Sequence, residues 1–268
     1  MTVPNQHNDT FSRWHRRALA ASIGASIGFL GLGWIAAAGA AQSDGPAAAS
    51  AGVAGSPAPL DGGGRHVLYV TRVDHADRRV DDDVRRYLEA HRFDVEMVDE
   101  SAPVSRSRGK DLVVISSVVS ARNMTGTGYR DVPVPLVTWE NDLFDSLRMT
   151  GQKKGVDYGE VGKEHYVTVV NAAHPLAGGL PAGKRWVYPR DEPMGWGVPA
   201  PGAYVAVTLA GEPRKAVVFG YEKGATMDYD FVAPARRVAF FLDNTTFGKL
   251  SADGRALFDA AVGWAVAR

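Results

Sequence analysis

The stretch that decides the fold is residues 132–141, which read VPVPLVTWEN. Leu136 and Val137 suit a short buried strand, because the prolines before them exclude a helix and remove two backbone donors. The strand is followed directly by residues 139–141, Trp-Glu-Asn. In an open α/β sheet, strand ends of this kind face the crevice in which ligands bind. The sequence therefore predicts a ligand site around Glu140.

Segments earlier in the sequence predict the strands and the helix that accompany this strand. Residues 111–117 are almost wholly apolar, which is typical of a parallel strand covered on both faces. Residues 66–71 are a β-rich run, and residues 77–91 repeat apolar side chains at the spacing of a helix with one buried face. Residues 95–98 predict another short strand. Strand, helix and further strands in this order imply a doubly wound, mostly parallel α/β sheet.

The second half of the chain has a different pattern. Several β-like runs follow one another with Gly and Pro between them, so we expect added antiparallel strands there. These runs are residues 166–170, 185–188, 204–209, 215–221 and 237–242. Ser251 is placed to cap a last helix that continues to Arg268. Trp196 lies between glycines, which predicts a loop with this side chain partly exposed.

The composition of the chain excludes several classes of function. Lys plus Arg is 30 and Asp plus Glu is 30 over 268 residues, so the net charge is zero and no nucleic-acid partner is predicted. The chain has no cysteine, which excludes thiol catalysis, disulfides and cysteine metal sites. A core of the predicted size needs no metal or disulfide to fold.

The N-terminal segment predicts export. Residues 18–41 carry no charge, follow Arg16-Arg17 and are long enough to span a bilayer. Small residues at positions 38–40 suit signal cleavage, so two outcomes stay open: a secreted protein, or one anchored in the membrane through residues 18–41. The positive-inside rule places the rest of the chain outside the cytoplasm. Residues 42–64 predict a flexible Ala/Gly/Ser/Pro linker, and residues 65–268 the α/β domain.

Four segments together carry a resemblance to a known family. They are residues 112–117, 134–140, 171–180 and 240–243. Their order resembles the class I glutamine amidotransferase-like, flavodoxin-like superfamily, and more closely its trehalose-utilisation (ThuA-like) branch. The resemblance implies a flavodoxin-like fold over residues 66–268. Catalytic members place a cysteine after a central strand, where this chain has residues 139–141, so cysteine-dependent glutamine hydrolysis is excluded.

Glu140 and His174 are the candidate acid–base residues. Glu140 beside Trp139 is expected to be partly desolvated, which would raise its pKa toward a catalytically useful range. The alternative is a carboxylate that caps the next segment or pairs with an arginine. His174, set before Pro175, is either a ligand or proton shuttle, or a residue that bonds a neighbouring loop.

No metal site is predicted. His75, His174 and Glu140 do not have a spacing that is diagnostic of a metal. The acidic run at residues 81–83 is interpreted as a solvated helix face, because consecutive helical side chains point about 100° apart.

We expect a non-catalytic binding or scaffold domain for a carbohydrate or another small polar ligand, without a cofactor. Ser116 and Ser117 lack the flanking glycines of a nucleophile elbow, so their hydroxyls are expected to bind rather than attack. The alternatives are a sugar-acting hydrolase or isomerase that uses Glu140 and His174, and a purely structural partner domain. The residues expected to bind the ligand are His75, Ser116, Ser117, Trp139, Glu140, Asn141, His174 and Asp243.

Overall fold

The computed structural model describes residues 59–267. Within this range one sheet of eleven strands has the order β2-β1-β3-β4-β11-β10-β9-β6-β7, with β8 pairing with β10 and β5 with β8. The strands are β1 His66–Thr71, β2 Asp94–Asp99, β3 Leu112–Ile115, β4 Leu136–Thr138, β5 Tyr158–Glu164, β6 Tyr166–Val169, β7 Gly183–Trp186, β8 Glu192–Gly197, β9 Tyr204–Leu209, β10 Glu212–Tyr221 and β11 Arg237–Ala239. The helices are α1 Arg78–Ala90, α2 Ala121–Met124 and α3 Ala252–Val266. Short 3-10 helices are η1 Val104–Ser107, η2 Tyr129–Asp131, η3 Asn141–Leu143, η4 Pro175–Ala177, η5 Asp228–Asp230 and η6 Phe247–Lys249.

The first half of the chain builds the parallel part of the sheet. β1 pairs with β2 and β3, β3 with β4, and β4 with β11, all in parallel. With β11 counted as the fifth parallel strand, the order is 2-1-3-4-5, which is the flavodoxin-like order. The register sets Ile115, Thr138 and Ala239 side by side. The residues that follow these three strands therefore emerge at one edge of the sheet.

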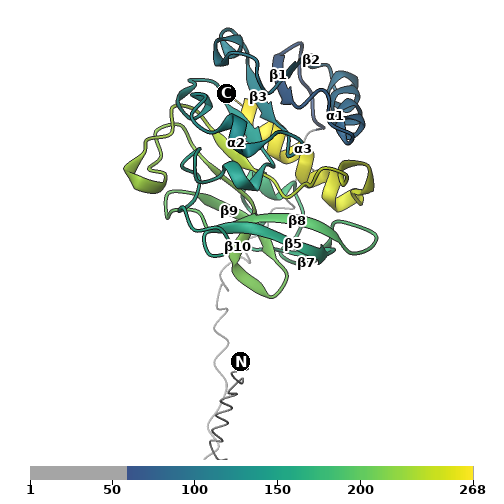
Figure 1. The fold of residues 1–268 in the computed structure, drawn as a ribbon. Coiled ribbons are helices and arrows are strands. Elements are labelled where there is room, and N and C mark those ends of the chain that lie inside the picture. The colour runs from purple at the N-terminus through teal and green to yellow at the C-terminus, as the bar shows by residue number, and fades with distance from the viewer. Residues whose placement is uncertain (1–58, 268) are drawn as a thin grey trace, which may run out of the picture. The chain divides into compact units, whose positions relative to one another are not determined.

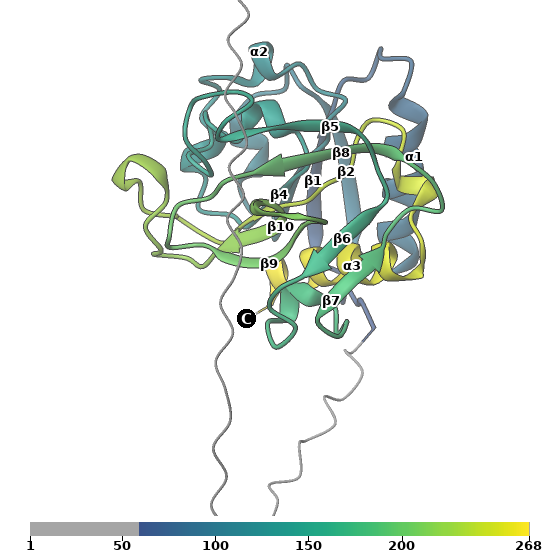
Figure 2. The same cartoon turned by 90° about the horizontal axis from the view of Figure 1, so that it is seen from below.

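Antiparallel strands extend the sheet beyond β11, as predicted. β10 pairs with β11, β9 with β10, β6 with β9 and β7 with β6, each in antiparallel orientation. A second ribbon, β5 and β8, branches from β10, and Figure 2 shows these two strands side by side. The predicted mixed α/β fold is confirmed.

The two faces of the parallel strands are covered differently. On one face Val84 and Leu88 of α1 and Leu257 and Phe258 of α3 belong to a single buried cluster. The hydroxyl of Tyr87 in α1 donates to Asp259 of α3 at 2.7 Å, so the two helices lie side by side (Figure 1). The other face is covered mainly by irregular segments around residues 119–134, 143–149 and 225–233.

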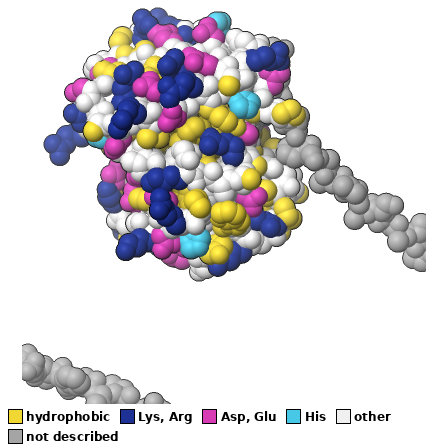
Figure 3. Space-filling model, turned by 90° about the vertical axis from the view of Figure 1, so that its right-hand side faces the viewer, with side chains coloured by type: hydrophobic (Ala, Val, Ile, Leu, Met, Phe, Trp, Pro, Cys, Tyr) yellow, Lys and Arg dark blue, Asp and Glu magenta, His cyan; other side chains and the backbone are white. Residues whose placement is uncertain are grey.

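The solvent side of α1 carries both charges. Arg85 lies 3.0 Å from Glu89, and Arg86 pairs with Asp83. Figure 3, which looks onto the side of the molecule that carries α1, shows basic and acidic side chains interspersed. This face therefore has no field of a single sign.

Local sequence signals explain several element ends. The Ser251 hydroxyl accepts a hydrogen bond from the backbone N–H of Gly254 at 3.1 Å, which is the predicted N-cap of α3. The segment after β4 forms the short helix η3, which is followed by turns.

Trp196 corrects the expected loop around it. It lies in β8 and is 4% exposed, under the ammonium of Lys215 at 4.6 Å from the ring centre. The sequence there has few large apolar side chains, and the strand forms because β5 and β10 flank it.

The folded domain begins before residue 65, where the sequence analysis placed its start. Leu60 is buried in the main core, and the Gly62 N–H donates to the His91 carbonyl at 2.7 Å. Residues 59–64 therefore belong to the folded unit. The expected export segment, residues 18–41, lies outside the described residues. Within residues 59–267 we find no helix with the length and apolar character needed to cross a membrane.

Candidate functional site

A polar cavity of about 310 Å³ lies at the C-terminal ends of β3, β4 and β11. We call it the acidic crevice. Its lining residues are Ser117, Trp139, Glu140, Asn141, Asp142, Lys154, Glu160, Leu242, Asp243 and Asn244. Four of these carry carboxylates and one carries an ammonium. The crevice therefore offers mainly hydrogen-bond acceptors and, with all groups ionised, a net negative charge.

Among the residues that line the crevice, Glu140 has the pKa that is shifted most. It follows β4, is 9% exposed, and accepts a hydrogen bond from the Asp142 N–H at 2.8 Å. Burial raises the pKa of Glu140 to about 8, and the charges of Asp142 and Asp243 add to this effect. The Asp142 N–H and Lys154 oppose it. At neutral pH Glu140 is mainly protonated, so its carboxyl group can donate as well as accept.

The other acids face the same space. Lys154 lies 2.6 Å from one carboxylate oxygen of Asp142, whose second oxygen is buried without a partner among the described residues. Glu160 reaches the crevice from β5. Glu160 is exposed, and partial desolvation together with the charges of Asp243 and Asp142 raises its pKa. All four carboxyl groups line the same cavity.

Three more predicted residues lie at the crevice. The Ser117 hydroxyl is buried without a hydrogen-bond partner in the described part of the chain. Asn141 packs against the backbone of Gly195 in β8. Trp139 is 2% exposed and packs edge-on to Tyr69, with ring centres 6.1 Å apart, so it offers no open face for stacking.

Ser116 does not line the crevice. Its hydroxyl donates at 2.7 Å to Asp81, a residue of α1 that is only 2% exposed. The hydroxyls of Tyr69 and Thr71 also donate to Asp81. This corrects the expectation that residues 81–83 form a solvated face. The position of Asp81 between Val80 and Val84, on the apolar stripe of the helix, is the sequence signal that indicates its burial.

His75 is also apart from the crevice. It lies in the loop after β1, where its Nδ1 accepts from the Asp77 N–H at 3.1 Å. It is absent from the crevice lining. The residue helps to shape the turn that leads into α1.

His174 lies at the opposite edge of the sheet from Glu140, which corrects the expected acid–base pair. β6, which precedes it, runs antiparallel to the strands that deliver Glu140 and Asp243, because three antiparallel pairings separate β6 from β11. His174 stacks on Tyr204 with ring centres 4.5 Å apart and accepts from the Leu176 N–H at 3.2 Å. Burial lowers its pKa.

Together the topology and the crevice define a flavodoxin-like α/β protein with an acidic cavity at the carboxyl ends of its parallel strands. Among residues 59–267 no group of three or more His, Asp or Glu side chains is arranged to hold a metal ion.

Comparisons with known proteins add a similarity of fold. No protein-family model matches the chain, and no curated protein matches it. Among the solved structures that match is that of a putative GMP synthase component from Thermoplasma acidophilum. The two chains are 16% identical with a TM-score of 0.49, over 75% of this chain and 94% of the other.

Proposed function

We propose that this protein is a non-catalytic binding or scaffold module, exported or membrane-anchored, whose acidic crevice takes a carbohydrate or another small, donor-rich polar ligand. The observation that carries the proposal is the convergence of Glu140, Asp142, Glu160 and Asp243 on one cavity. Buried polar groups require hydrogen-bond partners, and acceptors in excess favour a ligand that brings hydroxyl or ammonium donors.

Two unsatisfied groups support a ligand site. The hydroxyl of Ser117 and one carboxylate oxygen of Asp142 are buried without partners in the described structure. Each such group costs free energy of about 1–3 kcal/mol unless a ligand or water satisfies it. A polyol that bonds both groups would recover part of that cost.

Recognition in this crevice rests on hydrogen bonds. Trp139, which was expected to bind the ligand, and Trp196, which was expected to be partly exposed, are 2% and 4% exposed. A planar stacking platform therefore does not form at the crevice. The resemblance of the four short segments to ThuA-like domains supports a sugar-related ligand.

A second candidate function is hydrolysis of a sugar derivative. The observation that favours it is a protonated Glu140, whose pKa is about 8, in the same cavity as Asp243. In glycoside hydrolysis one carboxyl group acts as the acid, and a second acts as the nucleophile or the base. In this version Asp243 takes the place that the sequence suggested for His174.

A thermal-shift screen of the full chain tests the proposal. Neutral sugars, polyols and small amines are compared at about pH 9, where Glu140 is ionised, in the wild type and in Glu140→Gln, which keeps the acceptor for the Asp142 N–H but loses the charge. We expect a stabilising ligand whose effect is reduced in Glu140→Gln and unchanged in Glu89→Gln, an exposed glutamate of α1. If no compound stabilises the wild type, or if Glu140→Gln responds fully, the proposal fails.

A cleavage assay separates the two candidate functions. Chromogenic glycosides incubated with the wild type should remain intact if the module only binds. Cleavage that disappears in both Glu140→Gln and Asp243→Asn would establish the hydrolase instead.

A further inference from the structure

A second cavity of about 330 Å³ lies on the face of the sheet that α1 and α3 do not cover. We call it the arginine pocket. Its apolar lining includes Ile115, Met124, Leu143 and Leu147. Its polar lining includes Thr125, Arg130, Asp131, Asp145, Ser146, Arg148 and Gln152. It shares no lining residue with the acidic crevice.

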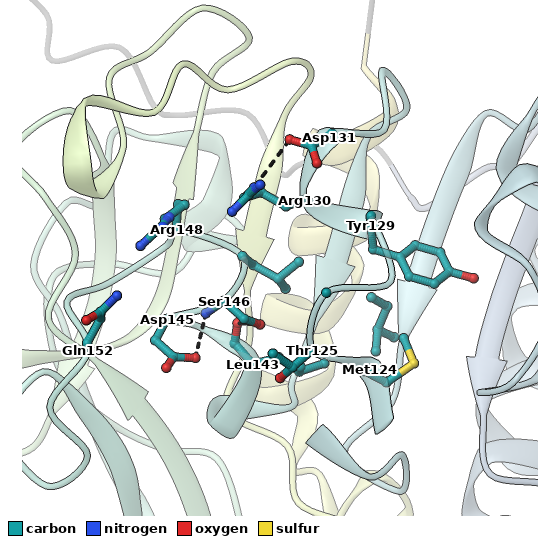
Figure 4. A pocket seen from close by; sticks show the side chains of 14 residues that line it. Met124, Thr125, Tyr129, Arg130, Asp131, Leu143, Asp145, Ser146, Arg148 and Gln152 are labelled. Atoms are coloured by element: carbon teal, nitrogen blue, oxygen red, sulfur yellow. Dashed lines mark hydrogen bonds and ion pairs between the residues drawn. The ribbon is translucent and has the colours of Figure 1, made fainter. Parts of the chain in front are cut away.

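Two arginines lie along one side of this pocket, above Leu143 (Figure 4). Each is stacked on an aromatic ring of the same loop. The guanidinium of Arg148 lies 4.7 Å from the ring centre of Tyr229, and that of Arg130 lies 5.3 Å from the ring centre of Phe231. Stacking occupies the face of a guanidinium group and leaves its N–H donors in the plane, where they can bind an oxyanion.

These donors are largely unused within residues 59–267. The Arg148 side chain makes no hydrogen bond or ion pair with any described residue. Arg130 makes one bond, from Nε to Asp131 at 3.3 Å. By contrast, the buried guanidinium of Arg237 donates to several backbone carbonyls. Arg148 is thus a half-buried cation without a counter-ion in the described structure.

The backbone holds this arrangement at an energetic cost. Arg148, Tyr229 and Asp230 all have positive φ angles, of 62°, 55° and 55°. For residues other than glycine such conformations are uncommon and strained. The Asp228 N–H donates to the Arg148 carbonyl at 3.0 Å, which joins the two strained segments. The bond holds the segment that carries Tyr229 beside Arg148.

The pocket is not uniformly basic. Asp131 is engaged by Arg130, and Asp145 accepts a hydrogen bond from the Ser146 N–H. Asp145 lies below Arg148 in Figure 4. An oxyanion would therefore bind toward the arginines, and its apolar body would lie over Leu143 and Ile115.

We propose that the arginine pocket binds a small organic oxyanion, a carboxylate or a phosphate monoester with an apolar body, through the free guanidinium edges of Arg148 and Arg130. Planar, bidentate contacts of this kind are characteristic of arginine with carboxylates and phosphates. The site is independent of the acidic crevice and of the function proposed for it.

Isothermal titration of the full chain with benzoate and with phenyl phosphate tests the proposal, and uncharged benzamide serves as the matched ligand. We expect at least one anion to bind and benzamide not to bind. Arg148→Gln should weaken binding by roughly tenfold or more, the effect of losing one charge-assisted contact. Arg148→Lys should also bind the anion more weakly than the wild type. Lysine keeps the positive charge, but it lacks the planar pair of N–H donors that makes a bidentate contact.

Two variants serve as controls. Arg255→Gln removes another stacked arginine, which lies 4.1 Å from the ring centre of Phe247 on the opposite face, and it should leave anion binding unchanged. Glu140→Gln should also leave it unchanged. If Arg148→Gln fails to fold, Arg130→Gln must show the loss in its place. Absence of binding by both anions, equal binding of benzamide, or an equal loss in Arg255→Gln would overturn the proposal.

Discussion

Glu140 and Asp243 follow two neighbouring parallel strands, β4 and β11, and line the same cavity. The charge of Asp243 is one of the causes that raise the pKa of Glu140. The pairing is a consequence of the fold, because the carboxyl ends of adjacent parallel strands meet at one edge of the sheet. Two acids 103 positions apart in the sequence are thereby brought to one site.

Removing the neighbouring charge should shift the titration of Glu140. In Asp243→Asn one negative charge near Glu140 is lost, so ionisation becomes easier and its pKa falls. Burial, the largest cause of the shift, remains, so the pKa stays above the ordinary value of 4.5. Carbon-detected NMR titration of the side-chain carboxyl measures the change. A pKa that stays constant or rises in Asp243→Asn would show that the two groups do not interact.

Glu140 should also make stability depend on pH. Its pKa is raised from 4.5 in the unfolded chain to about 8 in the folded one, so the native state binds the extra proton between these values. Native stability therefore falls as pH rises through this window, by an amount on the order of a few kcal/mol. Glu140→Gln removes this loss.

Urea denaturation at about pH 5 and about pH 9 measures the effect. As pH rises, the free energy of unfolding of Glu140→Gln should increase relative to that of the wild type. The free energy of unfolding of Glu89→Gln should change with pH as that of the wild type does. Parallel curves for Glu140→Gln and the wild type would contradict the prediction.

The buried Asp81 should be important for stability. Asp81→Ala leaves the hydroxyls of Tyr69, Thr71 and Ser116 without their shared acceptor, and we expect a loss of about 3 kcal/mol or more. Asp81→Asn keeps one acceptor oxygen and should lose less. Chemical denaturation measures both variants.

The control for Asp81 is Asp83→Asn, which removes an acid from the solvent side of the same helix. Asp83 is 52% exposed and pairs with Arg86, so the change should stay within roughly 0.5 kcal/mol. Equal losses for Asp83→Asn and Asp81→Ala would show that Asp81 is not specially stabilised.

Arg237 should be a second structural anchor. Its side chain is fully buried and donates to backbone carbonyls that include Val132, at 2.6 Å, and Val134, at 2.9 Å. Burial lowers its pKa to about 10. Arg237→Lys cannot reach all these carbonyls and should cost roughly 2–4 kcal/mol.

Hydrogen exchange locates the effect of Arg237→Lys. Protection should fall most in residues 130–136, the segment whose carbonyls the guanidinium holds. The exposed Arg214→Lys is the control and should leave exchange unchanged. Uniform loss of protection without a local maximum would show that Arg237 does not hold this segment.

Local signals in the sequence are sufficient for much of the fold. β1 was predicted with its observed bounds, and Ser251 caps α3 as expected. Glu140 was assigned to the crevice by the rule for parallel strand ends. β5 was missed, because Tyr158–Glu164 is largely polar and exposed, and it forms a strand only through its pairing with β8.

The errors in the predicted site have tertiary causes. His174 follows a strand whose direction depends on three antiparallel pairings, and no local pattern reveals that direction. The burial of Asp81 requires hydroxyls from β1 and from Ser116, which come from other parts of the chain. The arginine pocket joins residues around 130, 148 and 229, which are too far apart in sequence to suggest a site.

The measurement that tests the account most directly is the pKa of Glu140 in the full chain, followed by carbon-detected NMR with the resonance assigned through Glu140→Gln. The account predicts that this carboxyl group titrates near 8, as a buried acid among the other acids of the crevice. Titration near the ordinary value of 4.5 would show that Glu140 is solvated and unperturbed, and it would contradict the proposed site.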